Sequence, residues 1–236
     1  HRQGKKGCGM NMSFSYSPGD VIAPAIDWLN TNFHPLFAAI SLIVETILDV
    51  LLSVLSVLPA WALIAVIALL GWKLATWRIA LLVVGTLGFC WLMGLWEATL
   101  QTIALVLLAV FLSITIAFPL GIWAARNKRA EAALRPVLDI MQTVPPWVYL
   151  VPAVIIFSLG RTPALIATVV YGTPPMLRLT TLALNQVPKS FLELGEALGA
   201  PRLTTLFKIE LPIAKPTLLV GLNQCILLSL AMVVLA

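Results

Sequence analysis

Polar and aromatic residues interrupt the apolar stretches of this sequence at three places, where they could act on a small solute. Between Met141 and Pro152, two adjacent prolines remove backbone donors, so carbonyl groups lose their helical partners. The stretch from Tyr171 to Pro175 repeats this device, and a pair of amides lies further along the chain. The candidate solute-path residues are Gln142, Thr143, Pro145, Trp147, Tyr149, Tyr171, Thr173, Asn223 and Gln224.

Each of these residues, taken singly, is better explained by a hydrogen bond between helices or by a packing kink. Irregular backbone at membrane depth is tolerated where it is buried or lines a cavity. Trp147 also lies away from the expected membrane interfaces, where tryptophans usually gather. The three stretches together therefore favour a polar seam.

The sequence lacks the residue groupings that catalysis needs. The only histidines, His1 and His34, precede the long apolar stretches, and Cys8, Cys90 and Cys225 show no metal or redox spacing. No lysine follows the glycine pattern G-x-x-x-x-G that cradles phosphates. We therefore predict a chain that is not an enzyme, with no catalytic residue, no metal ligand and no cofactor of its own.

Composition places the chain in a membrane. Of its 236 residues, 60% are hydrophobic and 11% are charged, whereas a soluble domain carries about 25% charge. No Lys, Arg, Asp or Glu stands between Ala98 and Trp123, a length typical of a bilayer span. The net charge of +5 does not indicate nucleic acid, because the basic residues lie between the apolar stretches.

The expected fold is all-α, with about six transmembrane helices after an amino-terminal amphipathic helix. Residues 1–20 form a polar tail that is partly foreign, 21–58 an amphipathic scaffold region, and 59–236 the membrane domain, which we expect to be truncated at its end. The amphipathic helix is predicted over Pro35 to Leu58, with a tilted seventh span as the alternative. The expected spans are Ala60 to Trp77, Ile79 to Leu95, Ala98 to Trp123, Val137 to Leu159, Pro163 to Leu184, and Ile213 to Ala236.

Basic residues are concentrated in alternate links between these spans, which predicts that those links face the cytoplasm. The longest such link covers residues 185–211. Ser190 and Glu193 have the spacing of a capping box, which predicts a helix from Phe191 to Leu198. Gly199 would then supply a turn with positive φ. Pro201 would open a second short helix, which Pro212 would end.

Two short helices around a glycine could dock on a soluble partner, or they could only close the loop at the membrane surface. A resemblance to a known family motif favours docking. Glu193, Gly199 and the run Ile209 to Pro212 match the spacing of the "EAA loop" of ABC importer permeases, although Leu194 and Gly195 replace its two alanines. The resemblance implies that this loop couples to an ATPase subunit. The implied coupling residues are Glu193, Gly195, Glu196, Ala197, Leu198, Gly199, Arg202, Leu203, Ile209, Leu211 and Pro212.

The stretches QTVPPWVYLVP, ATVVYGTPPMLRLT and GLNQ resemble permeases of the glycine betaine/proline/choline importers. This likeness implies a type I importer fold, a permease homodimer in contact with lipid, and a multi-pass location in a bacterial or archaeal cytoplasmic membrane. It also implies a separate ATPase chain, which binds ATP and Mg, and an extracytoplasmic solute-binding protein. No nucleic-acid partner is implied.

Three alternatives remain open at this point. A permease of the same superfamily for another solute, such as an amino acid, would carry the same coupling loop. A secondary transporter driven by protons or sodium would usually need a buried acid, which the third, fifth and sixth predicted spans lack. A membrane enzyme would need a cluster of His, Asp, Glu or Cys, which the sequence does not show.

Overall fold

The computed structural model describes the backbone of residues 18–236 and the side chains of Trp28 and of residues 31–236. This described part is built from helices and contains no strand, as predicted. Residues 1–17 of the predicted polar tail lie outside it. The elements are α1 (Pro18–Ser56), α2 (Ala60–Leu74), α3 (Trp77–Leu92), α4 (Trp96–Arg126), α5 (Lys128–Thr143), α6 (Trp147–Phe157), α7 (Arg161–Asn185), α8 (Lys189–Ala197), α9 (Arg202–Thr205), the π-helix η1 (Leu206–Glu210) and α10 (Leu211–Leu235).

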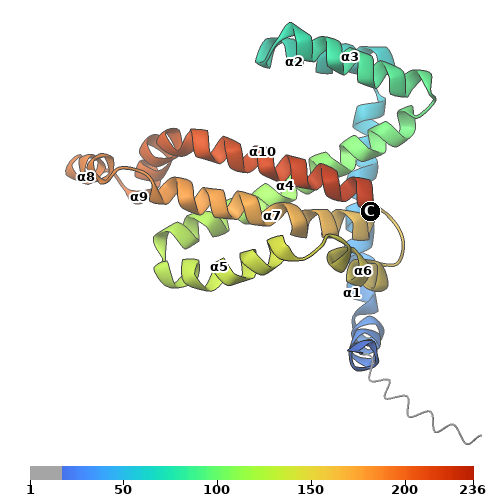
Figure 1. Cartoon of the computed structure of the whole chain (residues 1–236), viewed down its shortest axis with the longest axis horizontal. Helices are drawn as coiled ribbons and strands as arrows, with labels where there is room; N and C mark the ends of the chain where they lie inside the picture. The colour runs from blue at the N-terminus through green and yellow to red at the C-terminus, as the bar shows by residue number, and fades with distance from the viewer. Residues whose placement is uncertain (1–17) are drawn as a thin grey trace, which may run out of the picture.

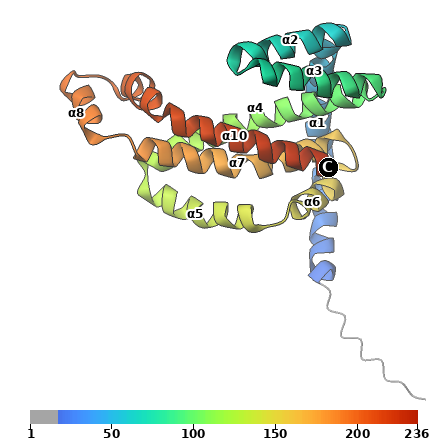
Figure 2. The same ribbon diagram turned by 45° about the horizontal axis from the view of Figure 1, so that its top comes forward.

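The central helix is α7, and α4 and α10 pack along it (Figures 1 and 2). With 25 residues, α7 is about 37 Å long, enough to cross a hydrocarbon core of about 30 Å. Its threonines and two internal prolines are buried by the neighbouring helices, so they do not have to face lipid. The predicted span Pro163 to Leu184 therefore lies within α7, and α7 can carry polar residues because the neighbouring helices enclose it.

Small residues let these three helices approach closely. A Cβ added at Gly121 of α4 would lie 2.6 Å from Thr180 Cβ of α7. A Cβ at Gly172 of α7 would lie 2.7 Å from the Ser229 hydroxyl of α10. Close backbone approach at small residues is the usual way in which membrane helices associate, since lipid supplies no hydrophobic drive between them.

The first helix is longer than the sequence predicts. The expected start at Pro35 is wrong, because α1 begins at Pro18 and continues through that proline. A proline removes one hydrogen-bond donor but leaves the rest of the helix in place. In the ribbon views, α1 runs crosswise to α4, α7 and α10 (Figures 1 and 2). Its Leu48 is 1% exposed and packs in one apolar cluster with residues of α4 and α7.

The predicted count of six spans is not confirmed. Among the described residues, three helical stretches are long and apolar enough to cross a membrane: Thr31–Ser56, Trp96–Arg126 and Arg202–Leu235. The first of these has the length and composition of a seventh span, but α1 runs crosswise to α4, α7 and α10 (Figures 1 and 2), which is the orientation of an interfacial helix beside them. The helices α2 and α3 have only 15 and 16 residues, whereas a full span needs about 20. They pack mainly on each other and form a hairpin beside the bundle (Figure 1).

The predicted fourth span, Val137 to Leu159, is wrong as a single helix. The helices α5 and α6 meet at an angle of 92° across the break after Thr143. Val144 is extended, with φ −75° and ψ 131°, as expected for a residue before proline. Pro145 and Pro146 then lack the amide donors that would continue α5. Counted as one broken span, this pair raises the number of candidate spans to four.

Candidate functional site

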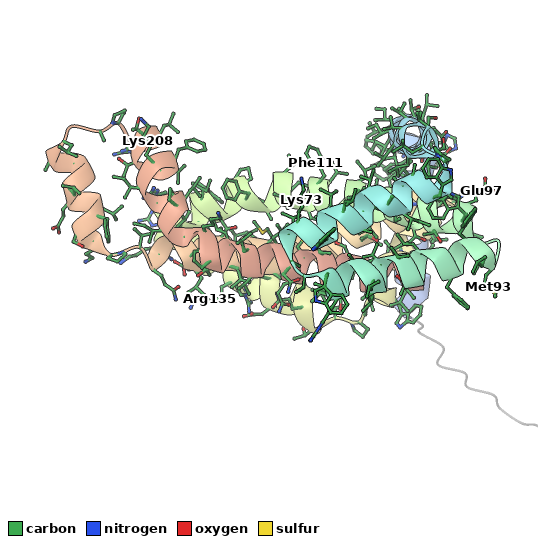
Figure 3. All side chains as sticks on the ribbon, turned by 90° about the horizontal axis from the view of Figure 1, so that it is seen from above. Lys73, Met93, Glu97, Phe111, Arg135 and Lys208 are labelled. Carbon is green, nitrogen blue, oxygen red and sulfur yellow. The ribbon has the colours of Figure 1, made fainter. Side chains whose placement is uncertain are left out.

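Basic residues gather at one end of the helix bundle, which we call the basic end. It holds the end of α4, the start of α5 and the helices α8 to η1. Figure 3 places Lys208 and Arg135 toward this end and Glu97 and Met93 at the opposite one. The links after the third and fifth predicted spans lie at this end, as expected of links that face the cytoplasm, whereas Figure 3 shows Lys73 of the link after the first predicted span midway between the two ends.

The segment from residue 189 to 210, which we call the protrusion, extends beyond the membrane helices at the basic end (Figure 1). The predicted capping box is wrong. Helix α8 begins at Lys189, Pro188 occupies the N-cap position, and no side chain caps the helix. The first residues of α8 are exposed, so water can satisfy their amides, and the fixed φ of Pro188 sets the entry of the chain.

The predicted turn at Gly199 is confirmed. Its φ is +66°, a conformation that costs other residues energy but not glycine. The amide of Gly199 donates to the Glu196 carbonyl at 2.9 Å, and the amide of Ala200 donates to the Gly195 carbonyl at 3.0 Å. These two bonds form a Schellman motif, which satisfies the last carbonyls of α8.

Gly195 lets α8 pack directly on the following helical segment. An added Cβ would lie 3.1 Å from Ile209 Cδ1 and 3.4 Å from the Thr205 side chain. The glycine that departs from the alanine of the family motif therefore has a packing role, beyond its expected lower helix propensity. The predicted contact residues all remain exposed on the protrusion, and their docking role stays a prediction: Glu196, Ala197, Leu198, Arg202 and Leu203.

The predicted end of the second helix at Pro212 is wrong. Residues from Arg202 to Leu235 form a continuous helical rod, in which η1 precedes α10 and Pro212 lies in its first turn. The amide of Leu211 donates to the Leu206 carbonyl, five residues back. An ordinary helix would bring the Pro212 ring against the carbonyl of Lys208. The wider π segment accommodates the proline, and such segments are frequent at functional sites.

An ion pair that the sequence does not reveal joins η1 to α4. Arg126 Nη2 lies 2.5 Å from Glu210 Oε1 and 2.6 Å from Oε2. The Glu210 side chain is 2% exposed and that of Arg126 is 49% exposed. A carboxylate this deeply buried needs a charged partner. The two residues are 84 positions apart, so no local pattern could pair them.

The structure brings part of the predicted solute path together. Gln142 of α5, Tyr171 of α7 and Gln224 of α10 line one cavity of about 230 Å³. The Tyr149 and Tyr171 rings lie 6.3 Å apart, and the Tyr149 hydroxyl donates to the Met141 carbonyl at 2.9 Å. Because the chain bends between α5 and α6, Tyr149 of α6 lies next to Tyr171 at the cavity.

Backbone carbonyls add to the polarity of this region. Pro174 and Pro175 of α7 have no amide hydrogen, so the carbonyls of Val170 and Tyr171 lack their usual helical donors. The cavity itself is lined by two side-chain amides and one tyrosine, which are groups that can form hydrogen bonds with a small polar molecule.

Other predicted path residues lie outside the cavity. Thr173 is buried and donates to the Val169 carbonyl at 2.6 Å, which is the helix-bonding alternative. Thr143, Pro145 and Asn223 are exposed beside it. Trp147, the first residue of α6, is 54% exposed. Their roles in a path stay predictions.

We expect Trp147→Ala to reduce solute uptake by about three- to tenfold, the range for loss of one aromatic contact with a cation. The residue follows the break between α5 and α6 and is too exposed to hold the core. The measurement is uptake at matched expression, with co-purification of the ATPase as the control for assembly. Unchanged uptake would return Trp147 to a packing role.

The fold and these two regions define a helical membrane protein of the transport class. Its long helices expose apolar side chains, most of its described basic residues lie toward one end, and its helical protrusion projects there. Within the described residues, no group of three His, Cys, Asp or Glu side chains could hold a metal ion.

Residues 117–236 match the family described as "Binding-protein-dependent transport system inner membrane component", and the chain belongs to this family. Members of the family are ABC transporter permease subunits, which are components of inner-membrane transport systems that in general include an ATPase and a solute-binding protein. The apolar helices agree with an inner-membrane location.

Three curated relatives are similar over most of this chain. The "Glycine betaine/proline betaine transport system permease protein ProW" of Escherichia coli is 40% identical over 91% of this chain and 61% of its own length. The "Glycine betaine transport system permease protein OpuAB" of Bacillus subtilis is 38% identical over 92% of this chain and 77% of its own. The "Glycine betaine/carnitine transport permease protein GbuB" of Listeria monocytogenes is 34% identical over 93% and 81%.

Proposed function

We propose that this chain is the transmembrane permease subunit of an ATP-driven importer for glycine betaine and similar osmoprotectants. The observation that carries this proposal is the similarity to betaine permeases over more than nine tenths of the chain. The protrusion at the basic end supports it, because its exposed apolar tip offers a surface for a soluble subunit (Figure 1).

ATP is hydrolysed by a separate ATPase chain, which binds ATP and Mg. The sequence agrees with this proposal, because no lysine in it follows the phosphate-binding glycine pattern. The exposed residues of the protrusion, Leu198 and Leu203 among them, contact that ATPase, and its closure moves α8.

The solute passes between aromatic and amide side chains. Aromatic faces attract quaternary ammonium groups, and Tyr171 lies at the cavity with Tyr149 close by. Gln142 and Gln224 can donate to the carboxylate of a betaine. Asn223 and Gln224 are exposed, so one chain encloses only one side of such a path. The proposed transporter therefore contains two copies of this chain, surrounded by lipid. An extracytoplasmic binding protein delivers the solute.

The test is uptake of radiolabelled glycine betaine in cells that lack other betaine importers. The full-length permease is co-expressed with its ATPase and binding protein, and an ATPase-dead variant serves as the control. We expect uptake in the active complex and its loss in the control.

A complex that assembles but takes up no betaine would reject the solute and keep the permease assignment. A screen of amino acids and other osmolytes would then follow, because another ABC permease solute is the alternative. Uptake that persists in the ATPase-dead control would instead favour a proton- or sodium-driven carrier.

A further inference from the structure

Adjacent residues of η1 contact two different helices. Ile209 reaches α8 at Gly195, where an added Cβ would lie 3.1 Å from Ile209 Cδ1. Glu210 reaches the end of α4, where both of its carboxylate oxygens lie within 2.6 Å of Arg126 Nη2. The π segment therefore forms a connector between the exposed helix of the protrusion and the membrane bundle.

An apolar cluster surrounds this connector. Leu206 of η1 packs with Ala183 and Leu184 of α7 and with Ala214 of α10, and the neighbours of the ion-paired residues, Ala125 and Leu211, pack against them. Apolar contacts are not directional and allow helices to slide. The ion pair between the buried Glu210 carboxylate and the half-exposed Arg126 is directional, so it orients η1 against the end of α4.

Arg126 is also well placed to pass a movement onward. It is the last residue of α4, and the next residue, Asn127, caps α5 by accepting from the amides of Arg129 and Ala130 at 3.0 and 3.3 Å. Helix α5 therefore begins after a single residue beyond the end of α4, with its first turn capped at that corner. Its Asp139 forms an exposed ion pair with Arg178 of α7, and its last turn carries Gln142 of the cavity.

We propose that the Arg126–Glu210 ion pair is the positioning link that passes movement of the protrusion to the α4–α5 corner, and so to the broken segment beside the solute cavity. This inference rests on the proposed function. Glu210 and Arg126 touch neither solute nor nucleotide; they set the position of α5 relative to α8. Without the pair, α8 can move while α5 stays behind.

The test compares transport and ATP hydrolysis in one preparation. The full-length permease is purified with its ATPase, reconstituted in proteoliposomes and supplied with its binding protein. Betaine uptake and ATPase rate are measured for wild type, Glu210→Gln, Arg126→Gln and the double variant. We expect each single variant to lower the solute carried per ATP about fivefold, within the range for residues along a coupling network.

The double variant separates a link from two independent defects. If the two residues act only through their pair, the double variant should transport about as much solute per ATP as the worse single variant, and less than wild type. Multiplied losses would overturn the proposal, as would single variants that match wild type. The double variant also leaves no unpaired buried charge, so it decides the case if the single variants do not assemble. A double variant that assembles and stays coupled, or one that cannot assemble, would overturn the link.

Glu131→Gln is the matched control. Glu131 pairs with Arg135 at 2.9 Å within α5, at the same end of the molecule but on the surface. Its loss should leave transport per ATP within about twofold, because exposed ion pairs contribute little. Absence of ATP-driven betaine uptake in the wild-type complex would defeat the proposed function, whereas normal wild-type uptake with unaffected variants would defeat only this inference.

Discussion

Gly199→Pro should reduce ATP-driven uptake by about tenfold or more, which is within the range of coupling free energies between protein sites. The φ of Gly199 is +66°, whereas a proline ring holds φ near −65°. The substitution also removes the amide that donates to the Glu196 carbonyl at 2.9 Å. The end of α8 is therefore redirected and the exposed face of the protrusion is lost. The measurement is betaine uptake by the reconstituted complex, with thermal unfolding of the permease followed in parallel.

The membrane helices should stay folded in this variant, because Gly199 is exposed and an added Cβ would meet nothing within 4 Å. That open space gives two matched controls. Gly199→Ala keeps the amide and meets only the cost of positive φ, about 1–2 kcal/mol. Gly199→Asn should be nearly neutral, since asparagine adopts this conformation readily. Normal uptake in Gly199→Pro would contradict the coupling role of the protrusion, and equal losses in all three variants would show that the positive φ of residue 199 is not the cause.

The sequence predicted features that a single residue type or a continuous run dictates. The charge-free run from Ala98 to Trp123 lies within α4, because only a long apolar helix satisfies its backbone in lipid. The turn at Gly199 was predictable because few other residues accept its φ. The adjacent prolines after Val144 predicted the loss of helical hydrogen bonds within one span, but not the separation of that span into two helices at 92°.

Features that depend on neighbours could not be predicted in this way. The capping box at Ser190 has the right spacing, but Pro188 and solvent already set the start of α8. Pro212 does not end its helix, because the π segment before it makes room for the ring. The pairing of Arg126 with Glu210 joins residues 84 positions apart, and only the packing of α4 against the end of the protrusion reveals it. The sequence also could not show which predicted solute-path residues meet in space. Of these residues, only Gln142, Tyr171 and Gln224 line the cavity.

The second large effect concerns the bundle itself. Gly121→Ala should destabilise the permease by about 1–3 kcal/mol, as overpacking of a tight core does. Its new Cβ would lie 2.6 Å from Thr180 Cβ, an atom fixed to the α7 backbone that no rotamer change can move. Helices α4 and α7 must therefore separate, which also strains the bond from the Thr181 hydroxyl to the Gly121 carbonyl at 3.2 Å. The measurement is the midpoint of thermal unfolding in detergent, with membrane yield.

Gly85→Ala is the control for that experiment, because a Cβ at this exposed position of α3 would meet nothing within 4 Å. It should be neutral or slightly stabilising, since alanine is the better helix former by up to about 1 kcal/mol. Adding Thr180→Gly to Gly121→Ala removes the side-chain atoms that the new Cβ would meet and should recover part of the lost stability. Equal midpoints for Gly121→Ala and Gly85→Ala would show that α4 and α7 do not cross at these residues. Recovery by Thr180→Gly would show that this one contact causes the loss of stability. If α4 and α7 were destabilised in general, a new glycine within α7 would lower the stability further.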